Sequence, residues 1–530
     1  MISTPEPFGP PAQRCRVRRE ALPLGDCAEP LEAFLRLRGL HGGVLMESAD
    51  QGAPTGRYSV VVPNPSLRLV LRGTDATFDA LDARGLGLLP HLVARHGGTL
   101  AGSKARLQTA VDPVNPALSD KERLAAPGPL DALRWMAALC TDDSPSPLGP
   151  PSIYGAISYE IVDGFEVLPN RKVSSFDDPD AHFVLGLDSV AYDHVAGEVV
   201  VTTRGFDDES VEAFLARHEA MCRALRAPGV TPNLAPFRAA VTEKAATPDT
   251  SDERFLANIR SFLEHIAAGD IFQGVLSRGL RMESDASPLE VYAQLRAMNP
   301  SPYMFYVDLE DGVLLGASPE TCVKVVGGEM EIKPIAGTVP RGFHADGTID
   351  RELDTRLEMS LLLDRKEQAE HAMLVDLARN DVARVSVPGS RYVDRPLAIE
   401  KYSHVQHLVS RVRGTLREGV DALHAYKASA NMGTLTGAPK LRAMELIREH
   451  EPTSRGFYGG AVGYLMQDGT FDTCIVIRSL RWKHGEFLMR SGAGVVMESD
   501  PDRELAETLH KARACRVAVA KAEAARKGDM

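Results

Sequence analysis

The segment from Pro334 to Gly342, PIAGTVPRG, combines residue types that suit the binding of an anion. Gly337 removes a Cβ where a ligand can approach the backbone, and Pro340 restricts the neighbouring chain. Thr338 and Arg341 offer donors of the kind that bind a carboxylate. A rigid carboxylate-binding loop is one interpretation. An ordinary surface turn, which the same glycines and prolines favour, is the other.

A carboxylate is expected on the apolar face of a helix between Asp354 and Asp381. Leu363, Glu370, Leu374 and Leu377 are seven, four and three residues apart, which is helical spacing. A carboxylate on that face is costly unless it is paired with an arginine or binds a cation. The two alternatives are therefore a buried salt bridge and a metal ligand.

An arginine is placed in a similar way on a predicted strand within DTCIVIRSL. Alternation puts Cys474, Val476, Arg478 and Leu480 on one face of that strand. A guanidinium among apolar neighbours must meet a carboxylate, either of the protein or of a ligand. Glycine-rich stretches precede and follow it in the sequence, and their backbone N–H groups can face an anion.

Two other patterns have ordinary structural explanations. The last helix is expected to be capped by Ser499 or Asp500, with Pro501 in its first position, and the helix dipole alone favours Glu504 and Glu507 in its first turns. His404 and His407 stand just before an apolar, strand-like run, where most histidines are structural.

The composition is that of an ordinary globular protein. The 530 residues are 44% hydrophobic and 25% charged, with a formal net charge of −12, and no basic run with interleaved aromatics indicates a nucleic-acid partner. No stretch of about 18 apolar residues predicts a membrane span, and the polar N-terminus is unlike a signal peptide. The seven scattered cysteines argue against a disulfide framework and against a zinc site. We expect a cytoplasmic protein without nucleic-acid or membrane partners.

The chain divides into two predicted units, 1–235 and 250–530, because residues 227–253 are rich in Pro, Thr and Ala. A capping box at Thr250 and Glu253 predicts a helix that stops at Gly269. Glycines 327 and 328 predict a hairpin turn. Many hairpins together with long helices predict an α+β fold. Strands are expected at 58–62, 67–71, 198–203, 271–282, 303–309, 312–318, 460–466, 471–479 and 487–490, and further helices at 31–37 and 129–139.

Seven segments resemble, in their order and spacing, those of the chorismate-utilising enzymes, and among these the large subunits of anthranilate synthases. The segments are PIAGTVPRG, EHAMLVDLARND, YSHVQHLVSRV, NMGTLTGAPK, YGGAVGY, DTCIVIRS and GAGVVMESDP. The resemblance covers the chain from about Gly42 to the last helix. It implies two antiparallel-rich β-sheets packed as a sandwich with flanking helices, and chorismate and Mg²⁺ bound between the sheets.

The resemblance also implies roles for individual residues. Glu370 and Glu507 match the Mg²⁺ ligands, and carboxylate oxygens suit that hard cation. Glu320 matches the general acid that protonates the departing 4-hydroxyl group, and His407 matches a histidine linked to the loss of pyruvate. The matching substrate contacts are Gly337, Thr338, Thr434, Tyr458, Arg478, Gly492, Ala493 and Gly494.

Two positions distinguish the reactions of the family. Members that add water carry a lysine base where this chain has Gln273, and members that make 4-amino-4-deoxychorismate carry a lysine nucleophile where it has Ala336. The resemblance therefore implies that ammonia adds at C2 and pyruvate is lost, which gives anthranilate for tryptophan biosynthesis. Val339 departs from the family pattern, in which an arginine is common after the threonine.

The resemblance implies a second site, at which tryptophan acts as a feedback inhibitor. VLMESAD, residues 44–50, resembles the tryptophan-binding segment of the family. A buried strand and an ordinary proline turn are the alternative explanation. The residues implied at this site are Glu47, Ser48, Pro302, Tyr303 and Met304.

Ammonia is expected to come from another chain. No cysteine lies in a glycine-flanked elbow of the glutaminase type, so we expect a separate glutaminase subunit and a heterotetramer. Two other functions stay open. One is a 2-amino-2-deoxyisochorismate synthase, which would stop before pyruvate is lost. The other is an inactive regulatory or binding subunit, against which Glu320, Glu370, Glu507 and His407 argue.

Overall fold

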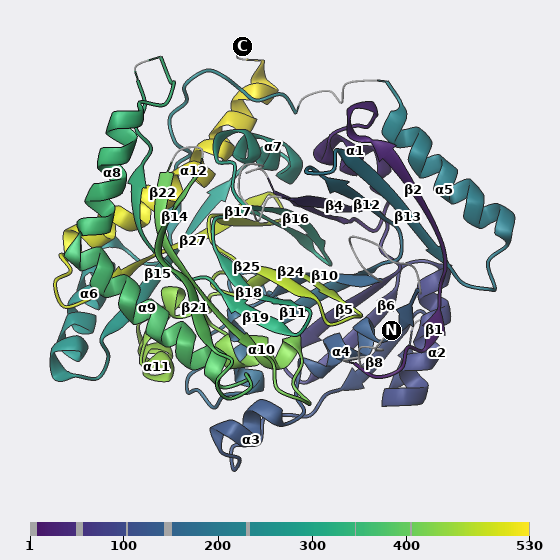
Figure 1. The fold of residues 1–530 in the computed structure, drawn as a ribbon, viewed down its shortest axis with the longest axis horizontal. Helices are drawn as coiled ribbons and strands as arrows, with labels where there is room; N and C mark the ends of the chain where they lie inside the picture. The colour runs from purple at the N-terminus through teal and green to yellow at the C-terminus, as the bar shows by residue number, and fades with distance from the viewer. Residues whose placement is uncertain are drawn as a thin grey trace.

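Two large β-sheets lie face to face, with helices around them (Figure 1). The structure is a computed structural model that describes residues 8–48, 57–101, 104–142, 151–228, 234–344, 346–402 and 405–528. Within these ranges every strand pairing in the two large sheets is antiparallel. The expected α+β fold of two antiparallel-rich sheets is confirmed.

The first sheet has 12 strands. In spatial order they are β14 (Thr247–Pro248), β15 (Gln273–Glu283), β27 (Glu486–Val495), β26 (Ser479–Lys483), β17 (Gly312–Ser318), β16 (Tyr303–Leu309), β3 (Val44–Glu47), β4 (Tyr58–Val62), β12 (Ser189–Asp193), β13 (Glu198–Gly205) and β2 (Arg16–Pro23), with β23 (Gly437–Ala438) paired to β15.

The second sheet has 13 strands. In spatial order they are β20 (Ile335–Pro340), β22 (Val405–Thr415), β19 (Glu329–Ile332), β18 (Thr321–Val326), β25 (Phe471–Ile475), β24 (Ala461–Met466), β10 (Ser152–Ile157), β11 (Ala181–Gly186), β5 (Leu67–Arg72), β6 (Asp75–Ala80), β8 (Arg106–Ala110) and β7 (Thr99–Ala101), with β21 (Tyr392–Lys401) paired to β22. A separate parallel pair joins β1 (Gln13–Arg14) and β9 (Cys140–Thr141).

Helices cover the outer faces of both sheets. They are α1 (Pro30–Leu37), α2 (Ala83–His96), α3 (Asp120–Ala125), α4 (Asp131–Ala137), α5 (Val211–Arg226), α6 (Asp252–Ala268), α7 (Pro288–Met298), α8 (Arg351–Leu363), α9 (Arg365–Ala383), α10 (Ala422–Ser429), α11 (Lys440–His450) and α12 (Pro501–Lys527). Among the described residues, no helix combines the length and the apolar character needed to cross a lipid bilayer.

Apolar side chains fill the space between the sheets. Val44 and Val60 of the 12-stranded sheet pack with Tyr154 and Val184 of the 13-stranded sheet in one buried cluster. A second cluster joins the outer face of the 12-stranded sheet to α1, α5, α7 and α12. A third joins the 13-stranded sheet to α2, α4, α9 and α10. Figure 1 shows these helices on opposite sides of the sandwich.

Strands from the two predicted units are neighbours in both sheets. β10 pairs with β24 along its whole length, and β3 pairs with β16. Within the predicted connection, residues 229–233 lie outside the described residues, and Thr247–Pro248 forms β14. The division into residues 1–235 and 250–530 stays a prediction.

Two helices differ from the sequence prediction. The helix expected between Asp354 and Asp381 is two helices, because the Asp364 side chain caps α9 by accepting from two backbone N–H groups of its first turn. Leu363, expected on the apolar stripe, ends α8 and is 70% exposed. In α6 the capping side chain is Ser251, not Thr250.

Candidate active site

Two chain segments cross between the sheets side by side, and they carry Glu320 and Arg478. β17 of the 12-stranded sheet continues into β18 of the 13-stranded sheet, and β25 continues into β26 in the opposite direction. The Ile475 N–H donates to the Glu320 carbonyl oxygen at 3.0 Å, and the Ala317 N–H donates to the Arg478 carbonyl oxygen at 3.1 Å. The fold thus places both functional candidates where the two sheets meet.

Arg478 does not lie on a continuous strand, so that prediction was wrong. Its φ is +52°, and it stands between β25 and β26. The expected shared face does not exist either, because Cys474 and Val476 pack between the sheets while Leu480 packs beneath the helices. Burial lowers the pKa of Arg478. Its guanidinium forms no ion pair with a described residue, which leaves it free for an anionic ligand.

Glu320 is a buried carboxyl group with one free oxygen. Its side chain is almost completely enclosed at 8% exposure, and Oε1 has no hydrogen-bond partner among the described residues. Burial raises the pKa of Glu320 to about 7, and Thr434 and Lys511 act in the opposite direction. The Thr434 hydroxyl also lacks a well-formed hydrogen bond. A carboxyl group that is half-protonated near neutrality suits proton donation to a ligand.

The segment Pro334–Gly342 contains the edge strand β20, which corrects both the loop and the turn interpretations. The register with β22 shifts between Ala336 and Thr338, and Gly337 at this bulge has a φ of +58°. A Cβ at Gly337 would also meet Leu361 at 2.6 Å. Backbone conformation and close packing both favour glycine here.

The bulge places Thr338 beside His407 on the neighbouring strand. Thr338 Oγ1 lies 2.9 Å from His407 Nδ1, and the Tyr402 ring packs edge-on against the imidazole. Burial lowers the pKa of His407 to about 4, so the ring is neutral at neutral pH. Arg341 does not face a ligand, because it forms a bidentate pair with Asp354 at 2.8 and 3.2 Å. The other histidine considered from the sequence, at position 404, lies outside the described residues.

Glycines of β27 form a further wall against Tyr458. A Cβ on Gly492 would lie 2.9 Å from the Tyr458 hydroxyl oxygen, and one on Gly494 would lie 3.0 Å from Gln273 Nε2. Ala493 between them is buried. Gln273 is buried too, and its Oε1 has no partner within the described part of the chain. Only backbone and small side chains therefore fit at this part of β27.

Carboxylates of α9 and α12 act on one another through their charges. Burial, followed by the charges of Glu367 and Glu507, raises the pKa of Glu370. Glu504 also has a raised pKa, caused mainly by burial, and its Oε2 is buried without a partner. Lys511 offsets part of this charge, with Nζ 2.5 Å from Glu507 Oε1. Glu370 is partly buried and Glu507 is exposed, and carboxylate oxygens with excess negative charge fit a hard divalent cation such as Mg²⁺.

Charge interactions link the residues predicted for catalysis and metal binding. Arg478 influences the pKa of His407, and Glu507 influences the pKa of both Arg478 and Glu370. The charges of these residues are therefore coupled, and their shared role in one site stays a prediction. Sequence reasoning did not identify Glu367, whose signal was its position one helical turn before Glu370 on the same face.

The residues predicted to bind tryptophan lie elsewhere, where β3 pairs with β16. Glu47 stands opposite Met304 in the register. Its carboxylate accepts from the Tyr292 hydroxyl at 2.7 Å and from Arg296 Nε at 3.0 Å. Glu47 therefore already has internal partners and positions its neighbours.

Ser48 is the free polar group beside this strand pair. Its backbone N–H donates to Ser59 Oγ at 3.3 Å, but its own Oγ is buried without a partner in the described structure. Pro302 is buried, and the Tyr303 hydroxyl donates to Asp472 at 3.0 Å. Positions 49 and 50 of the predicted segment lie outside the described residues.

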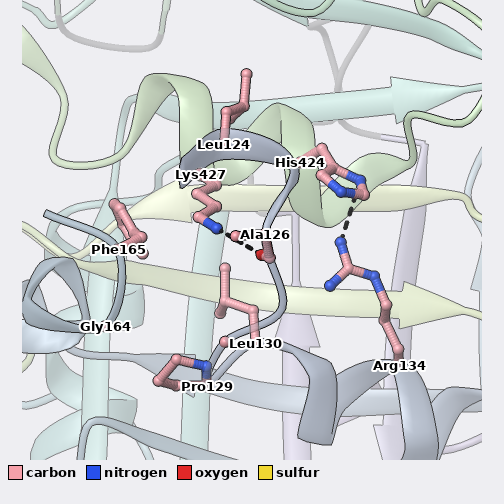
Figure 2. Close-up of a pocket in the computed structure, with 10 residues that line it drawn as sticks. Leu124, Ala126, Pro129, Leu130, Arg134, Gly164, Phe165, His424 and Lys427 are labelled. Carbon is pink, nitrogen blue, oxygen red and sulfur yellow. Dashed lines mark hydrogen bonds between the residues drawn. The ribbon is translucent and has the colours of Figure 1, made fainter. Parts of the chain in front are cut away.

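A recess beside α10 contains none of these residues (Figure 2). Arg134 Nη2 lies 3.1 Å from His424 Nδ1, and Lys427 Nζ donates to the Ala126 carbonyl oxygen at 3.0 Å. Arg134 also binds the Asp421 carboxylate at 2.6 and 2.8 Å. Because these groups already bind the protein's own atoms, the recess is a packing seam between α10 and the loop before α4.

Known proteins are similar to this chain over most of its length. The profile of the chorismate binding enzyme family matches residues 99–516. The chain is 41% identical over 490 residues to anthranilate synthase component 1 of Salmonella typhimurium, and the alignment covers 90% of this chain and 92% of that one. It is 41% identical over 486 residues to the Escherichia coli K12 protein of the same name, with the same two coverages.

Solved structures share the fold. Anthranilate synthase component I from Streptococcus pneumoniae superposes with a TM-score of 0.68 at 28% identity and covers 94% of this chain and 99% of its own. The menaquinone-specific isochorismate synthase of Escherichia coli superposes with a TM-score of 0.64 at 18% identity, and the match covers 95% of this chain and 94% of that one. This similarity shows the fold alone. Together with the crossing segments that hold Glu320 and Arg478, these matches show that the chain belongs to the chorismate-binding enzyme family.

Proposed function

We propose that the protein is a lyase that converts chorismate and ammonia to anthranilate, pyruvate and water, at the start of tryptophan biosynthesis. The observation that carries the proposal is the free, buried oxygen of Glu320 at the crossing that also holds Arg478. Relatives named anthranilate synthase component 1 align with 90% of the chain and support the same assignment.

Substrate binding follows from the groups that the protein leaves without partners. Arg478 forms no ion pair with a described residue and would bind a carboxylate of chorismate. Thr434, whose hydroxyl lacks a well-formed bond, would donate to the ligand beside Glu320. Gly492 and Gly494 let the substrate approach the backbone of β27, next to Tyr458.

Glu320 supplies the proton for the first step. Ammonia attacks C2 of the ring, the bond from C4 to its oxygen breaks, and Glu320 protonates the leaving oxygen, which departs as water. A bound dianionic substrate raises the pKa of Glu320 above its value of about 7 in the free protein, which keeps the proton in place until it is needed.

The second step restores aromaticity. A base removes the C2 proton as enolpyruvate leaves and becomes pyruvate, and the ring becomes anthranilate. His407, with a pKa of about 4, is neutral and oriented by Thr338 at 2.9 Å, so it is suited to assist this loss.

Mg²⁺ bound by Glu370 and Glu507 would supply orientation and charge stabilisation for a substrate carboxylate. Glu367 and Glu504, one helical turn before those ligands, would add negative charge around the ion and so strengthen its binding.

Ala336 and Gln273 support ammonia as the nucleophile. Ala336 is buried on β20, and its methyl group cannot form a covalent adduct. The Gln273 amide is not a base at neutral pH, so it cannot activate water for addition. Both positions therefore disfavour the competing reactions of the family.

Partners and regulation are part of the proposal. A separate glutaminase chain would deliver the ammonia within a cytoplasmic heterotetramer. Tryptophan would inhibit by binding where β3 meets β16, and the unpartnered Ser48 Oγ is a group that a ligand there can bind. The residues proposed for this site are Glu47, Ser48, Pro302, Tyr303 and Met304.

The test is an incubation of the purified chain with chorismate, Mg²⁺ and ammonium in a mildly alkaline buffer, followed by anthranilate fluorescence. We expect a fluorescent product from the wild type and almost none from Glu320→Gln. A non-aromatic aminated product would instead indicate a 2-amino-2-deoxyisochorismate synthase, and no product would contradict both. Replacement of ammonium by glutamine should abolish turnover of the chain alone, whereas efficient use of glutamine would contradict the separate glutaminase.

A further inference from the structure

A histidine, a cysteine and a glutamate meet at the edge of the 12-stranded sheet. His218 and Cys222 lie four residues apart on α5, and Glu20 reaches them from β2. Their ligand atoms all lie within 4.8 Å of one another. β2 is the last strand on this side of the sheet, and α5 packs over β13 beside it (Figure 1). None of these residues belongs to the candidate active site.

The spacing of the three ligand atoms fits a single zinc ion. His218 Nε2 lies 3.7 Å from Cys222 Sγ and 3.6 Å from Glu20 Oε2. Tetrahedral bonds of about 2.0 Å to nitrogen or oxygen and about 2.3 Å to sulfur place N and S about 3.6 Å apart and N and O about 3.3 Å apart. A shift of a few tenths of an ångström, within the reach of small rotamer changes, would complete the coordination.

The hydrogen bond on the other ring nitrogen of His218 directs Nε2 toward Cys222 and Glu20, and Nε2 lies 3.7 Å from Cys222 Sγ as a hydrogen-bond partner. Its Nδ1 lies 3.0 Å from Thr203 Oγ1, and the Thr203 hydroxyl donates to Met221 Sδ at 3.8 Å. Because that hydroxyl proton is already used, Thr203 accepts from Nδ1–H, and the Nε2 lone pair faces the other two residues. Metal-binding histidines are held by such a partner on the second ring nitrogen.

Glu20 has one oxygen to spare and opens the site to solvent. Arg226 Nη2 binds Oε1 at 3.1 Å, which leaves Oε2 toward His218. The Glu20 side chain is 35% exposed, so an ion can enter there with a water molecule as its fourth ligand. The Cys222 thiol is buried, so a substrate cannot reach it, whereas an ion needs only the space between the three side chains.

We propose that Glu20, His218 and Cys222 form a zinc site that fastens the edge strand β2 to α5. The ligands come from two elements about 200 residues apart in the sequence, which is why cysteine spacing alone argued against zinc. A metal clip at this place would add to the hydrogen bonds between β2 and β13 and to the ion pair between Glu20 and Arg226, and so stabilise the edge of the sheet.

Cobalt substitution of the full chain tests the proposal. The protein is stripped with a chelator and titrated with Co²⁺, which gives a sulfur-to-cobalt charge-transfer band only where a thiolate binds the metal. We expect this band to saturate at one equivalent in the wild type, to disappear in Cys222→Ser and to be displaced by Zn²⁺. Cys15→Ser, which removes a thiol elsewhere in the chain, should keep it. The carboxylates of α9 and α12 offer no sulfur, so cobalt bound there gives no such band.

Glu20→Gln provides a second variant at a partly exposed position. We expect its affinity for Zn²⁺ in a chelator competition to fall at least tenfold, and added Zn²⁺ to raise the thermal midpoint of the wild type more than that of the variant. A wild type without the sulfur band, or a band that survives Cys222→Ser, would overturn the proposal.

Discussion

Glu451, at the end of α11, joins three segments of the candidate active site from a buried position. It is 2% exposed, and its oxygens accept from Arg455 at 2.5 and 3.0 Å, from Arg490 at 3.1 Å and from Ser277 at 2.8 and 2.9 Å. Arg455 also donates to two backbone carbonyls, on β15 and in the turn before β23. The network holds β15, β27 and the turn before Tyr458 together.

We predict that Glu451→Gln lowers the free energy of unfolding by about 3 kcal/mol. Removal of one partner from a buried ion pair costs about 3–5 kcal/mol, because the other charge stays buried without compensation. Here Arg455 loses its carboxylate, whereas Arg490 keeps Asp249 at 2.9 Å. The amide keeps the size of the side chain and can still accept from Ser277, which places the loss at the lower end of that range.

Urea unfolding followed by circular dichroism measures the loss, with Asp376→Asn as the matched control. Asp376 pairs with Arg379 at 2.9 Å but is 78% exposed, so the same change of carboxylate to amide should cost less than about 0.5 kcal/mol there. A loss below about 1 kcal/mol for Glu451→Gln, or equal losses for the two variants, would refute the reasoning.

The pH dependence provides a further check on Glu451. Burial alone would raise its pKa, but Arg455 and Arg490 outweigh burial and hold the pKa below its usual value. A depressed pKa gives stability that is present above the unfolded value of about 4.3 and is lost as pH falls through the folded value. The difference between wild type and variant should stay constant from about pH 7 to about pH 5 and shrink below about pH 4.

Four further changes test the site. Glu320→Gln should lower kcat by about 10²–10⁴ with little change in chorismate affinity, and should remove the limb near pH 7 from the kcat/KM profile, corrected for free ammonia. Gly337→Ala should destabilise the fold by about 2 kcal/mol more than Gly327→Ala, which has the same sign of φ but no atom within 4 Å of the added Cβ; equal losses in urea unfolding would contradict this. Ser48→Ala should raise the tryptophan concentration for half-inhibition at least tenfold without changing the uninhibited rate, and unchanged sensitivity would exclude the proposed role. Glu370→Gln should raise the Mg²⁺ concentration for half-maximal activity at least tenfold, and an unchanged Mg²⁺ titration would argue against metal binding there.

Local patterns predicted several strands that stay within one sheet. β16 and β17 begin and end at the predicted residues, because each has an uninterrupted apolar run bounded by turn residues. The hairpin between β18 and β19 turns at Gly327 and Gly328, whose φ values of +57° and +79° suit a type I′ turn. For these strands, the spacing of apolar residues in the sequence matches the burial of the same residues in the fold.

Local patterns could not predict the crossings between sheets. The two-residue spacing of a strand continues in the sequence through Cys474, Val476 and Arg478, although the chain leaves one sheet and enters the other there. The spacing therefore does not reveal where the chain changes sheets. In the sequence pattern, Asp364 is one more residue of a continuous helix. In the structure its side chain caps a new helix. The individual roles of the site residues came from the resemblance to a family, because carboxylates on two helices as far apart in the chain as α9 and α12 have no common signal in the sequence.

The shared sheets have a consequence for the synthesis of the chain. β10 is synthesised about 310 residues before its partner β24. At a translation rate of about 5–20 residues per second, this edge of β10 stays unpaired for on the order of 15–60 s. The edge of β3 that later pairs with β16 also stays unpaired until β16 is synthesised. We expect the nascent first half to expose two apolar strand edges and to depend on chaperones until the second half emerges. Two fragments divided near residue 240 should therefore be insoluble apart and recover the fold only when they are produced together.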